Sequence, residues 1–124
     1  MKITVFFIIA LLAGIPSSLF AQSSTTTGPD NGTLVIVGGG RLDASIVDKF
    51  VELAGGENAH IVVIPSAGGR DTYGENYGGA GVFREAGAGR VTVLHTNNPK
   101  VADTDVFAEQ LEEATAVWFS GGRQ

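Results

Sequence analysis

Four short apolar segments recur along the chain, each followed by a turn or loop rich in glycine, proline or polar residues. Each is a run of four or five mostly apolar residues with many β-branched side chains, which is typical of strands buried on both faces. The pattern predicts strands at residues 33–37, 60–64, 91–94 and 116–119.

Segments in which apolar residues recur at helical spacing lie between these strands. They predict helices at residues 43–54, 79–86 and 104–114. Asp43 or Ser45 can cap the start of the first helix, and a glycine pair follows its last turn. The third helix is expected to turn four apolar side chains inward: Val106, Phe107, Leu111 and Ala114.

The regular alternation of strands and helices predicts the fold class. Buried strands joined by amphipathic helices indicate an α/β fold, in which a parallel sheet carries helices on both faces. The expected type is flavodoxin-like. A doubly wound domain normally continues beyond its fourth strand, so we expect a fold truncated after that strand, with the catalytic half encoded further on.

Composition narrows the classes of partner and cofactor. The chain has 124 residues, eight basic and thirteen acidic side chains and a formal charge of −5, which argues against binding of nucleic acid. The absence of cysteine excludes disulfides, thiolate zinc sites and a thiol nucleophile within these residues. No histidine motif for zinc occurs either, so no metal and no cofactor is expected.

The amino terminus has the pattern of a secretory signal peptide. Lys2 precedes an apolar run at residues 3–15, which is too short to span a bilayer as a helix. We expect a signal peptide at residues 1–21, a flexible linker at 22–32 and the folded domain at 33–124. The protein is thus expected to be secreted or periplasmic, without stable membrane association after cleavage, and homodimerisation is left open.

The glycines at residues 38–40 follow the first predicted strand. They suggest a dinucleotide fingerprint, but Asp43 stands where a third glycine or alanine belongs. The second strand also ends without the acidic residue that would bind a ribose. We interpret the segment as a tight turn in which Gly39 and Gly40 form a wall of a ligand crevice.

Hydroxyl and imidazole groups follow several predicted strands. Neither Ser66 nor Ser120 lies in a G-x-S-x-G elbow, so both are interpreted as turn or cap hydroxyls rather than nucleophiles, and Ser66 as a residue that contacts substrate. His60 begins a strand at the amino end of the sheet and is interpreted as structural. His95 follows a strand at the opposite rim, where it could touch a substrate.

The long loop at residues 66–78 is glycine-rich and polar, and loops in this position often carry function. Its polarity alone is consistent with a solvated loop. The functional alternative is a lip over the substrate, in which Tyr73 contacts the substrate and Asp71 and Glu75 favour a cationic group.

Gly121 and Gly122 are the strongest functional candidates. They follow the last predicted strand at the end of the sheet where ligands bind in open α/β folds. Their backbone N–H groups could form part of an oxyanion hole. The side-chain amide of Gln124 could donate a hydrogen bond to the substrate and accept one from it.

Four motifs occur in order at residues 33–40 (TLVIVGGG), 62–67 (VVIPSA), 93–96 (VLHT) and 117–124 (VWFSGGRQ). Together they resemble the cyanophycinase family, serine peptidases that are related to dipeptidase E and share the fold of class I glutamine amidotransferases. The resemblance implies that Gly121 and Gly122 are oxyanion donors and that Gln124 lines the substrate site. The family more often has Gly-Gly-Asp-Gln or Gly-Gly-Asn here, and Arg123 departs from the former.

The resemblance also implies the chemistry. A serine in a G-x-S-x-G elbow, encoded after residue 124 together with its histidine base, would hydrolyse amide bonds through an acyl-enzyme. The substrate would be a peptide or polymer, such as one with β-aspartyl-arginine units. The chain is therefore expected to be the amino-terminal part of a secreted peptidase, inactive as it stands. The alternative is a non-catalytic, flavodoxin-like module that binds a small ligand.

Overall fold

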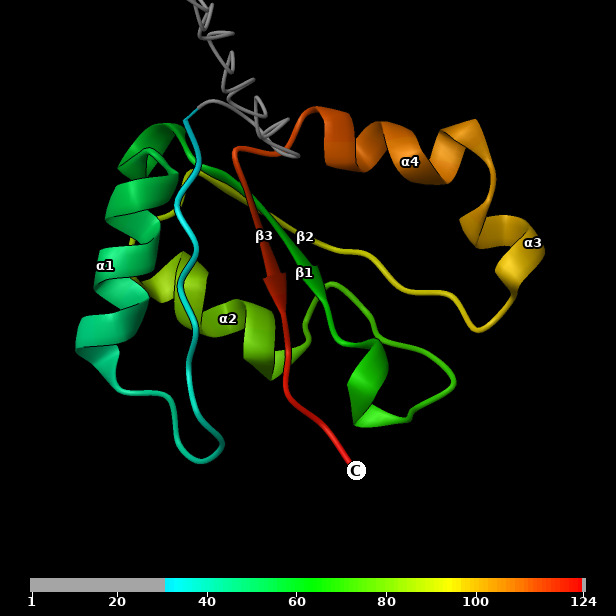
Figure 1. Cartoon of the computed structure of the whole chain (residues 1–124), viewed down its shortest axis with the longest axis horizontal. Coiled ribbons are helices and arrows are strands. Elements are labelled where there is room, and N and C mark those ends of the chain that lie inside the picture. Colours follow the sequence, from blue (N-terminus) through cyan, green and yellow to red (C-terminus); the bar gives the residue numbers. More distant parts are fainter. Residues whose placement is uncertain (1–30, 124) are drawn as a thin grey trace, which may run out of the picture. The chain divides into compact units, whose positions relative to one another are not determined.

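The computed structural model describes residues 31–123. It contains a three-stranded parallel sheet in the order β2-β1-β3, flanked by helices (Figure 1). The strands are β1 (His60–Ile64), β2 (Arg90–Val93) and β3 (Ala116–Phe119). The prediction of an α/β fold with a parallel sheet is confirmed.

Strand β1 lies at the centre of this sheet because both of its edges are paired. Val63 lies opposite Val93 of β2 on one side and Trp118 of β3 on the other. Successive side chains of a strand point to opposite faces, so Ile61 and Val63 face one side of the sheet and Val62 faces the other. All three are fully buried, as expected of a central strand covered on both faces.

Helices α1 (Ala44–Ala54) and α2 (Gly78–Glu85) provide most of the hydrophobic core. Their buried side chains pack with those of the sheet, and three aromatic rings meet at the centre of this core. Phe50 of α1 lies 5.5 Å from Phe83 of α2 and 5.0 Å from Trp118 of β3, measured between ring centroids. Trp118 is therefore a core residue, and its tilted and edge contacts are those that aromatic rings favour.

The ends of α1 are defined by its sequence. The Asp43 carboxylate accepts hydrogen bonds from the Ser45 amide at 2.9 Å and from the Ser45 hydroxyl at 2.6 Å, so Asp43 is the N-cap. Gly55 ends the helix in a left-handed conformation with φ of 114°, which glycine adopts without steric cost. Both assignments agree with the sequence prediction.

Two further helices follow β2. The short helix α3 (Pro99–Ala102) was not predicted, and α4 (Asp105–Glu112) begins at the N-cap Thr104. The expectation that Val106 and Leu111 point inward is wrong: the first is 73% exposed and the second 37%. Spacing alone identifies an apolar stripe but not what covers it, and in the first turn of α4 only Phe107 is partly buried.

The strand predicted at residues 33–37 is absent from the sheet, and this prediction is corrected. The segment is extended but has no hydrogen bonds of a strand ladder among the described residues. Val35 packs against the core cluster, whereas Leu34 and Ile36 are 82% and 84% exposed. The continuous apolar run therefore does not mean burial on both faces here, because one face of the segment contacts solvent.

The remaining bounds follow the predictions closely. The 3-10 turns η1 (Gly56–Asn58) and η2 (Ser66–Gly68) flank β1. The predicted signal peptide and all but the end of the predicted linker lie outside the described residues. No helix within residues 31–123 has the length and apolar character that crossing a membrane requires.

A first prediction concerns the exposed apolar side chains before α1. Replacing both Leu34 and Ile36 by threonine should change the free energy of unfolding by less than about 0.5 kcal/mol, because these side chains contact solvent. The double substitution should also reduce self-association measured by light scattering, since it removes exposed apolar surface. Val35→Thr is the matched control and should destabilise by roughly 1 kcal/mol. Equal destabilisation by both changes would contradict this placement.

A second prediction concerns the pH dependence of the α1 cap. Hydrogen bonds from the Ser45 hydroxyl and then the Ser45 amide lower the pKa of Asp43 below its ordinary value of 3.8. The charged carboxylate therefore stabilises the fold above that value, and the contribution is lost as pH falls through the lowered pKa.

Asp43→Asn should consequently lower the melting temperature at about pH 7, and the difference from the original protein should vanish at about pH 2. Asp48→Asn removes the same charge from an exposed position of α1 that is not its cap, and serves as the control. Thermal unfolding followed by circular dichroism at both pH values gives the comparison. A difference for Asp43→Asn that persists in acid would argue against the cap as its source.

Candidate functional site

The carboxyl ends of the three strands form one rim of the sheet. The amide of Leu94 donates to the carbonyl of Val63 at 2.9 Å, and the amide of Ser120 donates to that of Ile64 at 3.1 Å. These bonds extend the pairing past the ends of β2 and β3. The segments that follow the strands, with His95, Ser66 and the diglycine, therefore leave the sheet at the same end.

The diglycine that follows β3 lies against the turn η2. The amide of Arg123 donates to the carbonyl of Ala67 at 3.0 Å. A Cβ atom at Gly122 would overlap the backbone of Ala67, whereas one at Gly121 would meet open space. Glycine at position 122 is thus required by this close approach of two backbone segments.

The N–H groups of Gly121 and Gly122 make no hydrogen bond to any residue of the described range. Both glycines are exposed residues. This is the arrangement that an oxyanion or a carbonyl oxygen can use. Gly121 and Gly122 thus lie at the rim, and their N–H groups have no hydrogen-bond partner among residues 31–123.

A serine and a histidine meet beside the diglycine. The Ser66 hydroxyl lies 2.9 Å from Nδ1 of His95, and Ser66 is exposed. The other ring nitrogen of His95, Nε2, is buried and has no hydrogen-bond partner among the residues described. Sequence reasoning named both residues separately but missed the pair, because the signal is the adjacency of β1 and β2 rather than any local motif.

Tyr73 organises the long loop around this pair. Its ring stands edge-on to His95, with centroids 4.8 Å apart, and edge-on to Tyr77 at 5.1 Å. Its hydroxyl accepts a hydrogen bond from the amide of Arg70 at 3.3 Å and lies so close to Gly68 that a Cβ atom there would overlap it. Tyr73 is therefore half-buried in the site rather than free on a solvated lip.

The acidic residues of the loop have partners of their own. The Asp71 carboxylate accepts a long hydrogen bond of 3.4 Å from the Asn97 amide, and Glu75 lies 3.5 Å from the guanidinium of Arg84. Both carboxylates remain exposed, so surface ion pairing with Arg84 contributes little to stability. Asp71 lies closer to the rim, because Asn97 belongs to the segment after β2.

The glycine turn after the extended segment lies at the same end of the sheet as the carboxyl ends of β1 and β3 (Figure 1). Gly40 has φ of 121°, a conformation that favours glycine, and neither Gly39 nor Gly40 would meet a neighbour through an added Cβ atom. No hydrogen bond within the described range joins this turn to Ser66 or the diglycine. Gln124 lies outside the described residues.

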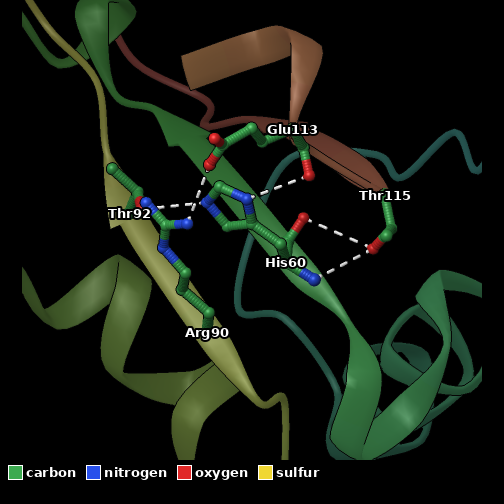
Figure 2. A network of polar contacts seen from close by, with 5 residues as sticks. All are labelled: His60, Arg90, Thr92, Glu113 and Thr115. Carbon is green, nitrogen blue, oxygen red and sulfur yellow. Dashed lines mark hydrogen bonds and ion pairs between the residues drawn. The ribbon is translucent and has the colours of Figure 1, made fainter. Parts of the chain in front are cut away.

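His60 lies at the opposite end of β1 and has a structural environment (Figure 2). It is 7% exposed, and its Nδ1 donates to the carbonyl of Glu113 at 3.1 Å while Nε2 accepts from the Thr92 hydroxyl at 3.0 Å. The hydroxyl of Thr115 accepts from the His60 amide at 3.0 Å. Both ring nitrogens are thus satisfied by protein groups, as buried polar groups usually are.

Two other features of the described range carry no chemistry of this kind. Residues 31–123 contain no cluster of three His, Asp or Glu side chains placed to bind a metal ion. A groove between the start of α1 and the end of α2 is lined by residues that include Arg41, the cap Asp43 and Glu85. None of the candidate substrate-binding or oxyanion residues lines it.

The curated proteins include a cyanophycinase from Geminocystis herdmanii that is 34% identical to this chain over 95 residues. The similarity covers 73% of this chain but 34% of the relative, so the chain spans about a third of the length of the protein it matches. This similarity supports a cyanophycinase-like family for the chain and points to a hydrolase. No family model matches the chain. No solved structure is significantly similar to it.

A third prediction tests the contact between the diglycine and η2. Gly122→Ala should destabilise by about 1–3 kcal/mol and shift the backbone amide signals of Ser66 and Ala67 in NMR spectra, because its methyl group would overlap the Ala67 backbone. Gly121→Ala has open space and should change stability by less than about 0.5 kcal/mol. Undisturbed amide signals around η2 in Gly122→Ala would contradict this packing.

Proposed function

We propose that the chain forms the amino-terminal part of a secreted serine-type peptidase of the cyanophycinase kind. The observation that carries the proposal is the similarity to a cyanophycinase over 73% of the chain. The arrangement of the rim supports it, because two free N–H groups stand at the end of a parallel strand where α/β enzymes bind their ligands.

In this proposal, Gly121 and Gly122 stabilise the oxyanion that forms when an amide carbonyl is attacked. Backbone donors preorganised in this way contribute more to rate than to binding, since charge on the oxygen develops in the transition state. Glycine is needed at position 122 because a side chain there would push the segment away from Ala67. Gln124, Tyr73 and Asp71 would contact the remainder of the substrate, together with Gly39 and Gly40.

The nucleophile and its base are proposed to lie beyond residue 124. The matched relative is about three times as long as the matched part, which leaves room for a further βα unit carrying a G-x-S-x-G elbow. Exposed apolar side chains are consistent with a further element that packs on them, among them Phe119 of β3, which is 73% exposed. Residues 1–21 would direct the protein out of the cytoplasm.

The substrate class proposed is a peptide or polymer with β-aspartyl-arginine units, and the reaction is hydrolysis of its amide bonds. Water is the second substrate, and the acyl group passes through an ester with the serine hydroxyl. The exposed carboxylate of Asp71 is suited to a cationic side chain such as arginine. No cofactor is required by this chemistry.

The fourth prediction tests this function with the complete coding sequence. Reading the gene beyond the codon of Gln124 should reveal a G-x-S-x-G motif within about one βα unit of roughly 30 residues. The complete protein should hydrolyse a β-aspartyl-arginine dipeptide in an assay of released arginine, whereas residues 1–124 alone should not.

In the complete protein, Gly122→Ala should lower kcat by about 10²-fold while changing KM much less, because oxyanion donors act mainly in the transition state. Leu34→Thr changes an exposed side chain that is distant from Gly122 in the sequence. It serves as the control and should remain folded and active. Turnover by residues 1–124 alone, or a complete gene without such a serine, would refute the proposed location of the nucleophile.

A further inference from the structure

Ser66 and His95 form a hydrogen-bonded pair at the rim that the proposed oxyanion site does not use. We propose that His95 donates its Nδ1 proton to Ser66 and thereby directs the Ser66 hydroxyl as a donor to a carbonyl or carboxylate oxygen of the substrate. This inference rests on the proposed function, since it assigns a further contact to the same substrate. Ser66 would then touch the substrate, and His95 would be a positioning residue.

The direction of the hydrogen bond follows from the second nitrogen of His95. A neutral imidazole carries one proton, so one nitrogen donates and the other accepts. If the proton were on Nε2, a buried N–H would stand without a partner among the described residues. Buried N–H groups without partners are rarer in proteins than unpaired buried acceptors. The proton therefore belongs on Nδ1, which faces the Ser66 oxygen at 2.9 Å.

Tyr73 holds the imidazole in this position. Its ring stands nearly perpendicular to that of His95, at an interplanar angle of 82°. The Tyr73 hydroxyl accepts a hydrogen bond from the Arg70 amide. It also lies close to Gly68, in the turn that carries Ser66. The serine, the histidine and the tyrosine are thus parts of one packed unit.

A serine oxygen that accepts from His95 keeps its own proton for another partner. Ser66 is exposed and its hydroxyl makes no second hydrogen bond within residues 31–123, so this proton points to solvent or ligand. The next residue, Ala67, accepts from the amide of Arg123, which places the hydroxyl on the turn that contacts the diglycine. The two free N–H groups and the hydroxyl are all donors, and a set of donors suits a ligand with oxygen acceptors.

The same geometry argues against Ser66 as a nucleophile. A nucleophilic serine must pass its proton to the imidazole, so His95 would have to accept through Nδ1 and carry its proton on the buried Nε2. No carboxylate or carbonyl of the described range receives that proton, in contrast to the third group that orients the base in catalytic triads. Ser66 is accordingly assigned to recognition of the substrate.

The fifth prediction is tested first through the tautomer of His95. Long-range ¹H–¹⁵N NMR spectra of the full chain distinguish a protonated from a bare ring nitrogen, and the chain has two histidines to assign. His95 should show the proton on Nδ1, and its pattern should change in Ser66→Ala but persist in Ser66→Thr, which restores the hydroxyl. A proton on Nε2 of His95 would overturn the inference.

Binding is measured next, with the β-aspartyl-arginine dipeptide as the probe. Titration of the same samples should shift the amide signals of Gly121 and Gly122. Ser66→Ala should raise the dissociation constant about tenfold, as expected for loss of a hydrogen bond to a charged or polar oxygen. Ser66→Thr should bind within about threefold of the original protein. Thr72→Ala removes a hydroxyl from an exposed position of the same loop and should leave binding unchanged.

The outcomes separate this inference from the proposed function. Shifts at the diglycine with the same dissociation constant in Ser66→Ala would overturn the role of Ser66 and leave the peptidase proposal standing. The absence of any shift in the original protein would overturn this inference, whereas the peptidase proposal is decided by the activity of the complete protein. Retained fold in Ser66→Ala is verified by unchanged amide signals in the core around Phe83, so a loss of binding reports on the site.

Discussion

The hydrogen bonds that join β1 to both of its neighbours determine where each candidate residue of the site lies. Through them Val63 lies level with Val93 and Trp118, and the segments that follow the three strands leave the sheet together. The central strand is held by burial of its side chains, each worth about 1.5–3 kcal/mol relative to exposure. A slip of β3 by one residue would turn Trp118 out of the core and carry the diglycine away from η2.

Much of this arrangement follows from local patterns in the sequence. The runs at residues 60–64 and 116–119 become β1 and β3 with the predicted bounds, since their β-branched and aromatic side chains favour buried strands. The start and end of α1 are also readable, because Asp43 and Gly55 act through bonds to residues within one turn. Features decided over a few residues are therefore predictable from the chain alone.

The failures concern features that depend on distant contacts. Residues 33–37 have the composition of a buried strand, but pairing requires a neighbour with free backbone groups, and composition does not reveal that neighbour. The apolar stripe of α4 is present, yet Val106 is exposed, because spacing along the chain does not reveal whether another element covers the stripe. The hydrogen bond between Ser66 and His95 is another case, since it depends on the adjacency of β1 and β2.

The two histidines show how position in a parallel sheet separates structural from functional groups. His60 lies at the amino end of β1, where Glu113 and Thr92 satisfy both ring nitrogens and leave no capacity for a ligand. His95 lies at the carboxyl end of the neighbouring strand, where Nδ1 contacts an exposed hydroxyl and the other nitrogen lacks a partner within residues 31–123. A fully satisfied polar group stabilises one conformation of the protein. A partly satisfied polar group lowers the stability of the fold but keeps hydrogen-bonding capacity. The incomplete hydrogen bonding of His95 is thus the physical reason to assign function to the rim rather than to the opposite end of the sheet.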